Sequence, residues 1–160
     1  MEIRAVTEAD VELLFELILE LASYEKLRDA VSGDAEVLRR TLFEQRAAEA
    51  LLIESGGEAV GYAITFTTFS SFECRSGVWI EDIYVRPEHR RGGIGRQVME
   101  RIATLALERG HVRLEWCALD WNEPALRFYQ SLGAKQMKEW IVHRLTPLEI
   151  ERLANEESQR

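Results

Sequence analysis

The apolar residues of this chain recur at two kinds of spacing, which predict helices and strands. Intervals of three and four residues predict helices from the Thr7 N-cap to about Tyr24, over 34–46, from Gly93 to Arg109, from Asn122 to Gly133 and over 147–154. β-Branched and alternating runs predict strands over 2–6, 50–54, 59–69, 77–86, 112–116 and 135–145. Residues 155–160 are expected to fray.

This order of elements predicts an α/β fold, with a mixed β-sheet flanked by helices. No repeat, linker or low-complexity stretch interrupts it. We therefore expect residues 1–160 to form a single domain.

Composition and charge narrow the class of protein. The chain is 46% hydrophobic and 30% charged, as in ordinary globular proteins, and no apolar stretch approaches the length of a membrane span. Its formal net charge of −8 argues against nonspecific binding to nucleic acid, which needs a basic surface. Cys74 is expected in a loop and Cys117 in a buried strand, without a disulfide framework. Together with the lack of a signal-peptide pattern, this predicts a cytoplasmic protein.

The three histidines, His89, His111 and His143, have no metal-ligand spacing, so no metal is expected.

The stretch from Glu81 to Arg96 joins an acidic strand, a basic glycine-rich turn and the start of a helix. Glycines let the backbone approach a ligand, helix N-termini attract anions, and arginines offer forked donors to phosphate oxygens. Gly95 is followed by Arg96-Gln97, which excludes a Walker A loop, and Val98 stands where a dinucleotide fingerprint needs glycine or alanine. The stretch predicts a phosphate site for a nucleotide-bearing cofactor beside a carboxylate.

At these residues the chain resembles the GCN5-related N-acetyltransferase (GNAT) superfamily. Its coenzyme A signature, Arg/Gln-x-x-Gly-x-Gly/Ala, is here Arg90-x-x-Gly93-x-Gly95. The likeness extends to the branch of diamine (spermidine/spermine) and thialysine acetyltransferases, whose segments are matched in order at 21–25, 81–85, 120–125 and 128–129. The resemblance implies an acetyl-CoA-dependent transferase with a splayed central sheet.

The resemblance also implies where acetyl-CoA binds. In such folds the pantetheine arm pairs with a strand edge, and the pyrophosphate rests on backbone N–H groups at a helix start. The residues so implied are Ile83, Tyr84, Val85, Arg90, Arg91, Gly92, Gly93, Ile94, Gly95, Arg96, Asn122 and Tyr129. Arg91 stands where this branch commonly has glycine.

Acetyl transfer to an amine needs a group that removes a proton, because alkylammonium groups are mostly protonated at pH 7. The resemblance implies Glu81 as this general base and Tyr129 as the general acid that protonates the thiolate leaving group. The N–H of Ile83 is the expected donor to the oxyanion. Asp82 is expected on the opposite face of the strand unless a bulge intervenes.

The implied acceptor is a small cationic amine: a diamine, a polyamine or a thialysine-like amino acid. Tyr24 and Glu25 match positions that line the polyamine site, and Glu81, Asp82 and Trp140 add acidic groups and an aromatic face. Members of this branch are usually homodimers, so a homodimer is expected.

Two alternatives stay open. The acceptor can instead be a protein N-terminus or a lysine side chain of a protein or peptide. Separately, Lys138-Glu139 replaces a longer acidic run of the diamine enzymes, which argues against spermidine in particular. The chain can also be a non-catalytic module that binds acetyl-CoA.

Overall fold

The computed structural model describes residues 1–157, and its chain divides into two compact units, Met1–Leu119 and Asp120–Arg160. The single domain over 1–160 stays a prediction. No helix within 1–157 is long and apolar enough to cross a membrane.

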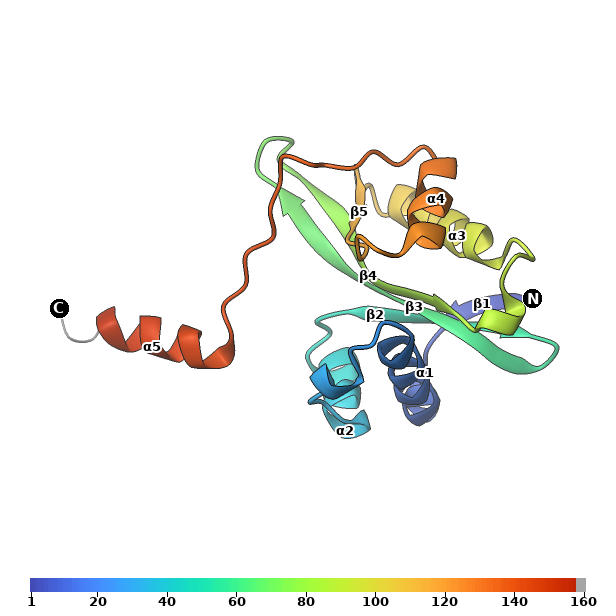
Figure 1. Cartoon of the computed structure of the whole chain (residues 1–160), viewed down its shortest axis with the longest axis horizontal. Coiled ribbons are helices and arrows are strands. Elements are labelled where there is room, and N and C mark those ends of the chain that lie inside the picture. Colours follow the sequence, from blue (N-terminus) through green and yellow to red (C-terminus); the bar gives the residue numbers. More distant parts are fainter. Residues whose placement is uncertain (158–160) are drawn as a thin grey trace. The chain divides into compact units, whose positions relative to one another are not determined.

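The first unit is built on a five-stranded sheet in the order β1-β2-β3-β4-β5 (Figure 1). Neighbouring strands are antiparallel from β1 to β4, whereas β5 is parallel to β4. The mixed sheet expected from the sequence is therefore confirmed. The strands are β1 Glu2–Ala5, β2 Glu49–Ser55, β3 Glu58–Ser70, β4 Arg75–Val85 and β5 Leu114–Trp116.

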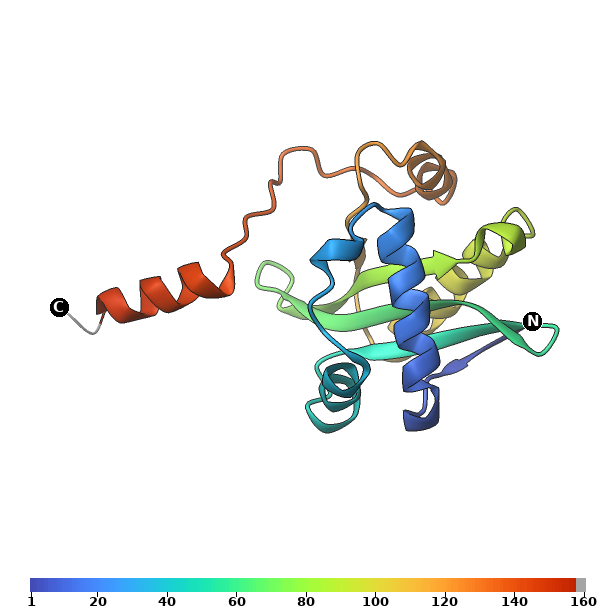
Figure 2. The same ribbon diagram turned by 60° about the horizontal axis from the view of Figure 1, so that its bottom comes forward.

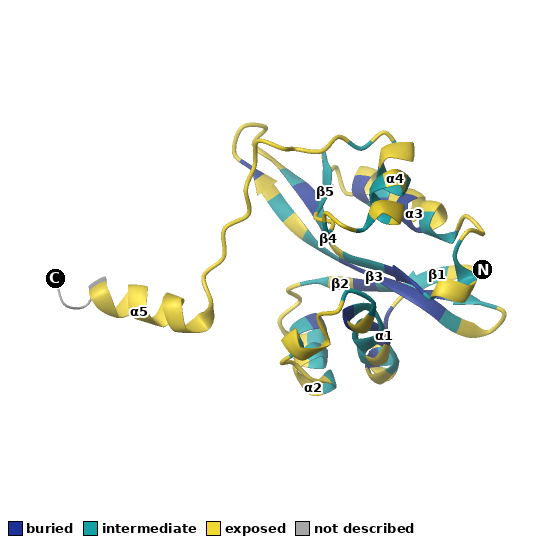
Figure 3. Cartoon of the chain, in the orientation of Figure 1, coloured by how far each residue is buried: buried dark blue, intermediate teal, exposed yellow. Residues whose placement is uncertain are grey.

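Helices cover both faces of this sheet. Helix α1 (Val11–Tyr24) and helix α2 (Ala35–Arg39) lie on one face, and α3 (Ile94–Glu108) lies on the other, as Figures 1 and 2 show. Buried residues concentrate in β2, β3 and β4 (Figure 3). On the α1 face the core includes Leu14, Leu17, Leu52, Tyr62 and Tyr84.

Two predicted helices in this unit differ in detail. The first begins with a 3-10 turn, Glu8–Asp10, in which the Asp10 carboxylate accepts hydrogen bonds from the N–H and the hydroxyl of the N-cap Thr7 and also pairs with Arg4. The helix expected over 34–46 consists of α2 and a π-helical turn, Arg40–Glu44.

The second unit contains α4 (Glu123–Ser131) and α5 (Pro147–Glu157). The predicted strand over 135–145 is wrong, since the structure has neither strand nor helix there. A strand needs a neighbour for its backbone hydrogen bonds, and no described strand pairs with this segment. Fraying at 155–157 is also wrong, because α5 continues to Glu157. Residues 158–160 lie outside the described part.

Candidate active site at the bulge of strand β4

Strand β4 carries a bulge at Glu81. Ile64 of β3 is opposite Asp82, but the next residue of β3, Thr65, is opposite Ile80. Glu81 therefore has no partner in the β3–β4 register, and the alternation of side chains along β4 is interrupted there.

The bulge brings both acidic side chains to the face of the sheet that α1 covers. Trp79 is opposite Phe66 and Asp82 is opposite Ile64, and these two β3 residues share that face because they are two positions apart. The Trp79 indole N–H donates to a Glu81 carboxylate oxygen at 3.0 Å, which holds Glu81 on the same side. The bulge that the sequence left open is thus present, and the side chains of Glu81 and Asp82 lie on the same face of the sheet rather than on opposite faces.

Asp82 is the more buried of the two acids. Its carboxylate accepts a hydrogen bond of 3.1 Å from the hydroxyl of Tyr62, a fully buried residue. Burial raises the pKa of Asp82 to about 6, the Tyr62 hydrogen bond opposes this rise, and the charges of Glu81 and Glu25 add to it. Burial also raises the pKa of Tyr62, so its hydroxyl remains a donor.

Glu25 joins this group from the end of α1. The helix ends in a Schellman motif, in which Leu27 N–H donates to Ala22 O and Lys26 adopts a left-handed conformation with φ of 61°. The turn fixes Glu25 beside the sheet, where burial raises the pKa of its carboxyl. Its charge raises the pKa values of both Tyr62 and Asp82, and the charge of Glu81 also raises that of Asp82, so the three carboxylates influence one another.

The edge of β4 next to these acids offers backbone hydrogen-bonding groups. Strand β5 pairs with β4 at Val78–Ile80 and goes no further. The N–H of Arg86 donates to Val60 O on β3. Because bonding directions alternate along a strand, the peptide groups of Ile83 and Val85 point away from β3, toward the edge that β5 leaves unpaired.

The turn after β4 has the shape of an anion cradle. Arg91 and Gly93 have φ angles of 69° and 80°, and Gly93 is the N-cap of α3. A Cβ built at Gly92 or Gly93 would meet no atom within 4 Å, so the space over the turn is open. Gln97 N–H donates to Gly93 O, so the N–H of Ile94 comes before the first of the helix's own hydrogen bonds. These features fit a bound phosphate group.

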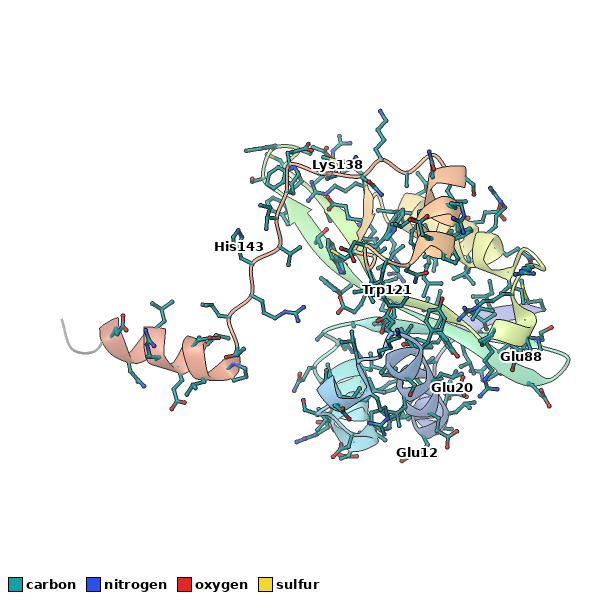
Figure 4. The ribbon with its side chains drawn as sticks, viewed as in Figure 1. Glu12, Glu20, Glu88, Trp121, Lys138 and His143 are labelled. Carbon is teal, nitrogen blue, oxygen red and sulfur yellow. The ribbon has the colours of Figure 1, made fainter. Side chains whose placement is uncertain are left out.

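The side chain of Arg90 lies against α1. Its guanidinium carbon is 4.5 Å from the centre of the Tyr24 ring and 5.7 Å from that of Tyr84. Its Nε donates to Val85 O at 2.7 Å. Tyr84, expected at the cofactor, is buried and its hydroxyl donates to Glu20 of α1. Figure 4 labels the Glu20 side chain on this helix.

The second unit holds the other predicted site residues. Asn122 caps α4 by accepting from Ala125 N–H at 3.4 Å. Tyr129 is on α4, with its ring centre 5.3 Å from that of Phe128. Trp140 is 70% exposed. The roles of Asn122, Tyr129 and Trp140 toward cofactor and acceptor stay predictions.

The two cysteines lie outside the predicted site. Cys74 is an exposed loop residue as expected, but Cys117 is exposed and follows the end of β5, so its predicted burial is wrong. The residues predicted from the sequence do not include Tyr62. The feature that could have indicated it is a tyrosine within an apolar strand, because the hydroxyl of a buried tyrosine needs a hydrogen-bond partner.

Comparison with known proteins agrees with this geometry. Residues 15–134 match the acetyltransferase (GNAT) family. The thialysine N-epsilon-acetyltransferase of Bos taurus is 36% identical over 146 residues, covering 86% of this chain and 85% of that protein. The Caenorhabditis elegans protein of the same name is 33% identical over 158 residues, covering 97% of this chain and 98% of its own. An integron cassette protein from the mobile metagenome of V. cholerae has a similar structure, with a TM-score of 0.78, 25% identity and coverage of 96% of both chains. The mixed sheet, the family match and these relatives confirm the resemblance noted in the sequence: the chain belongs to the GNAT family and is an N-acetyltransferase.

Proposed function

We propose that this protein transfers the acetyl group of acetyl-CoA directly to the primary amine of a small cationic acceptor, a diamine, a polyamine or a thialysine-like amino acid. The observation that carries the proposal is the group of Glu25, Glu81 and Asp82 beside the unpaired edge of β4. Three carboxylates in one place favour a cationic ligand. The names of the related thialysine acetyltransferases support the same class of acceptor.

The GNAT family implies acetyl-CoA as the acetyl donor, and the residues of the first unit fit it. We assign the Ile83–Val85 edge to the pantetheine amides and the backbone N–H groups from Arg91 to Arg96 to the pyrophosphate. Asn122 is proposed as a further contact. When bound, the cofactor supplies a thioester carbonyl that an amine can attack.

The acids divide the work of handling the amine. We propose that Asp82 and Glu25 bind the ammonium group in the partly buried end of the site. Glu81, which is exposed at the bulge, takes the proton that the amine must lose, directly or through a water molecule. The N–H of Ile83 points to the unpaired edge and is assigned as the donor to the carbonyl oxygen as negative charge develops on it.

Tyr129 is proposed as the general acid that protonates the departing thiolate. A phenol can donate its proton to a thiolate and recover it from solvent afterwards. No residue of the chain needs to carry the acetyl group, since the amine attacks the thioester directly.

A thiol-release assay tests the proposal. Purified protein and acetyl-CoA are mixed with spermidine, putrescine, lysine, thialysine, other amino acids and peptides, and thiol release is followed for each. We expect release with one class of small cationic amine. Release with peptides alone would assign the protein to protein acetylation, and acetyl-CoA binding without release to any amine would contradict catalysis.

Matched variants assign the roles. Glu81→Gln is expected to lower turnover by about 10²-fold or more, as loss of a general base does. Asp82→Asn is expected to raise the KM for the amine more than it lowers turnover. Glu58→Gln, an exposed acid in the β2–β3 hairpin, is the control and should behave as wild type. Wild-type turnover in Glu81→Gln would exclude Glu81 as the base.

We also propose a homodimer. Large apolar side chains of the second unit are more than half exposed, as at interfaces between subunits. They are Met137, Trp140, Ile141, Val142, Leu145, Leu148, Ile150 and Leu153. Light scattering coupled to gel filtration is expected to give twice the 18.4 kDa mass of the chain, and a monomer at micromolar concentration would contradict the proposal.

A cytoplasmic location is proposed as well, from the two unpaired cysteines. Fractionation of cells that produce the protein tests it, and recovery from the secreted fraction would contradict it.

A further inference from the structure

We propose that Arg90 is a positioning residue that ties the cofactor-binding edge of β4 to the acceptor-binding end of α1, so that the two halves of the site form together. This inference rests on the proposed function, because it assumes that acetyl-CoA binds at the β4 edge and the amine binds near Glu25.

Arg90 joins three segments that are far apart in the sequence. It follows the Pro87–His89 turn, its Nε donates to the last carbonyl of β4, and its guanidinium lies over the ring of Tyr24, the last residue of α1. The distance of 4.5 Å from the ring centre is within the range of a cation–π contact, and the helix C-terminus attracts a cation as well. Among residues 1–157 Arg90 forms no ion pair with a carboxylate, so these contacts orient its side chain.

Arg86 plays a separate part and so provides a comparison. Its guanidinium forms hydrogen bonds with both carboxylate oxygens of Glu20 and donates to Ala59 O. These contacts attach the same end of β4 to α1 at Glu20, one turn before Tyr24, but reach neither Tyr24 nor Val85 O. Arg86 thus stabilises the packing of α1 on the sheet, whereas Arg90 fixes the turn and the end of the helix.

The hydrogen bond to Val85 O restricts what the edge can offer a ligand. With that carbonyl occupied, the groups of the edge that remain for the pantetheine amides are the N–H and C=O of Ile83 and the N–H of Val85. Loss of Arg90 would release the Val85 carbonyl and let the strand end move, which weakens cofactor binding without removing any phosphate contact.

The contact between Arg90 and Tyr24 also limits how Tyr24 can bind the acceptor amine. One face of the Tyr24 ring is covered by Arg90, so that face does not receive the ammonium group of the amine. Tyr24 instead acts through its neighbour Glu25, whose position depends on where α1 ends. A change at Tyr24 should therefore alter acetyl-CoA affinity through its contact with Arg90.

The test is a double-mutant cycle between Tyr24→Leu and Arg90→Lys, read in the Kd for acetyl-CoA by calorimetry without an amine. A cation–π contact and a hydrogen bond of this kind correspond to about 3- to 30-fold in affinity. We expect each single variant to raise the Kd within this range, the double variant to be no weaker than the weaker single variant, and Tyr24→Phe to match wild type. Arg86→Lys is the control, expected to lower the melting temperature without coupling to Tyr24→Leu.

Two results would overturn the inference. One is an unchanged Kd in Tyr24→Leu, and the other is a double variant whose effect is the product of the two single effects. The calorimetric cycle uses no amine. If every acceptor failed in the thiol-release assay, the proposed acceptor would be rejected, but the calorimetric result would still decide the role of Arg90.

Amide hydrogen exchange of the ligand-free protein gives a second readout that requires no cofactor binding. Exchange of the Arg86 N–H, which donates to Val60 O just after the end of β4, is expected to be at least about threefold faster in both Arg90→Lys and Tyr24→Leu than in wild type. Unchanged exchange in the two variants would overturn the positioning role even if the protein bound no acetyl-CoA.

Discussion

Neutralising Asp82 should make the protein more stable at neutral pH. Burial raises the pKa of Asp82 from 3.8 to about 6, and each pKa unit corresponds to about 1.36 kcal/mol between the two protonation states. The folded protein thus holds the proton more tightly than the unfolded chain does. The free energy of unfolding therefore decreases as the pH rises from about 4 to about 6, and the decrease amounts to about 3 kcal/mol above pH 7.

The Asp82→Asn variant removes this loss but keeps an oxygen that can accept from Tyr62. We expect its free energy of unfolding to be similar to that of wild type near pH 4 and higher by up to about 3 kcal/mol near pH 7.5. Urea denaturation followed by tryptophan fluorescence at several pH values measures the difference. A variant that is less stable at pH 7.5, or a difference that does not grow with pH, would refute the argument from burial.

A control of opposite sign is available at Asp10. Hydrogen bonds from Arg4 hold the pKa of its carboxyl well below the usual range, so this group stabilises the fold above pH 4 and loses that effect in acid. The Asp10→Asn variant should therefore be less stable than wild type at pH 7.5, and the difference should shrink as the pH falls. Equal pH dependence in the Asp10 and Asp82 variants would mean that the assay does not report on these carboxyls.

The same pKa should appear in catalysis. If Asp82 binds the amine as a carboxylate, kcat/KM rises with pH up to about pH 6 and this limb is absent in Asp82→Asn. Glu81→Gln should move the limb to lower pH, because the Glu81 charge raises the pKa of Asp82. Tyr62→Phe should move it to higher pH, because the Tyr62 hydrogen bond lowers that pKa. Shifts in the reverse directions would contradict the assignment.

Three further predictions concern the backbone near the site and the proposed acid. Gly61→Ala should cost about 1–3 kcal/mol of stability in urea denaturation, since its Cβ would overlap the carbonyl oxygen of Tyr84, whereas Gly33→Ala, with open space around it, should cost far less; equal effects would contradict the close approach of β3 and β4. Gly93→Ala should weaken acetyl-CoA binding in calorimetry and destabilise the fold by about 1–2 kcal/mol, because φ at this N-cap is 80°; unchanged affinity would remove the turn from the cofactor site. Tyr129→Phe should lower kcat by about 10²-fold with an unchanged melting temperature, and wild-type kcat would exclude it as the general acid.

Local chemistry along the chain was enough to predict most helices, strands and turns of the first unit. Asn122 caps α4, and Gly56 and Gly57, both with positive φ, form the turn between β2 and β3. Both features act within a few residues of themselves, so their effects can be predicted without knowing what packs against them. The same holds for the cradle, where Gly93 takes a left-handed φ and starts α3. The family signature lies in this stretch, which is why the sequence also indicated the acetyltransferase family.

The predicted strand over 135–145 failed for the opposite reason. Its apolar residues, including Trp140 and Val142, have the composition of a strand, but a strand forms its hydrogen bonds with a neighbour. Composition measures the tendency of a segment to extend and carries no information on whether an edge is available to it.

The sequence by itself determined that an acidic strand leads into a phosphate-binding turn, because both properties belong to consecutive residues from Glu81 to Arg96. The tertiary structure decided how that strand presents its acids. The bulge at Glu81 exists because β4 is matched against β3, and it is this register that turns Glu81 and Asp82 to one face. The side chains that contact Asp82 and Arg90 could likewise not be predicted from the sequence. Tyr62 lies 20 residues from Asp82, and Tyr24 meets Arg90 through the packing of α1 on the sheet, so these contacts depend on distances that only the folded chain sets.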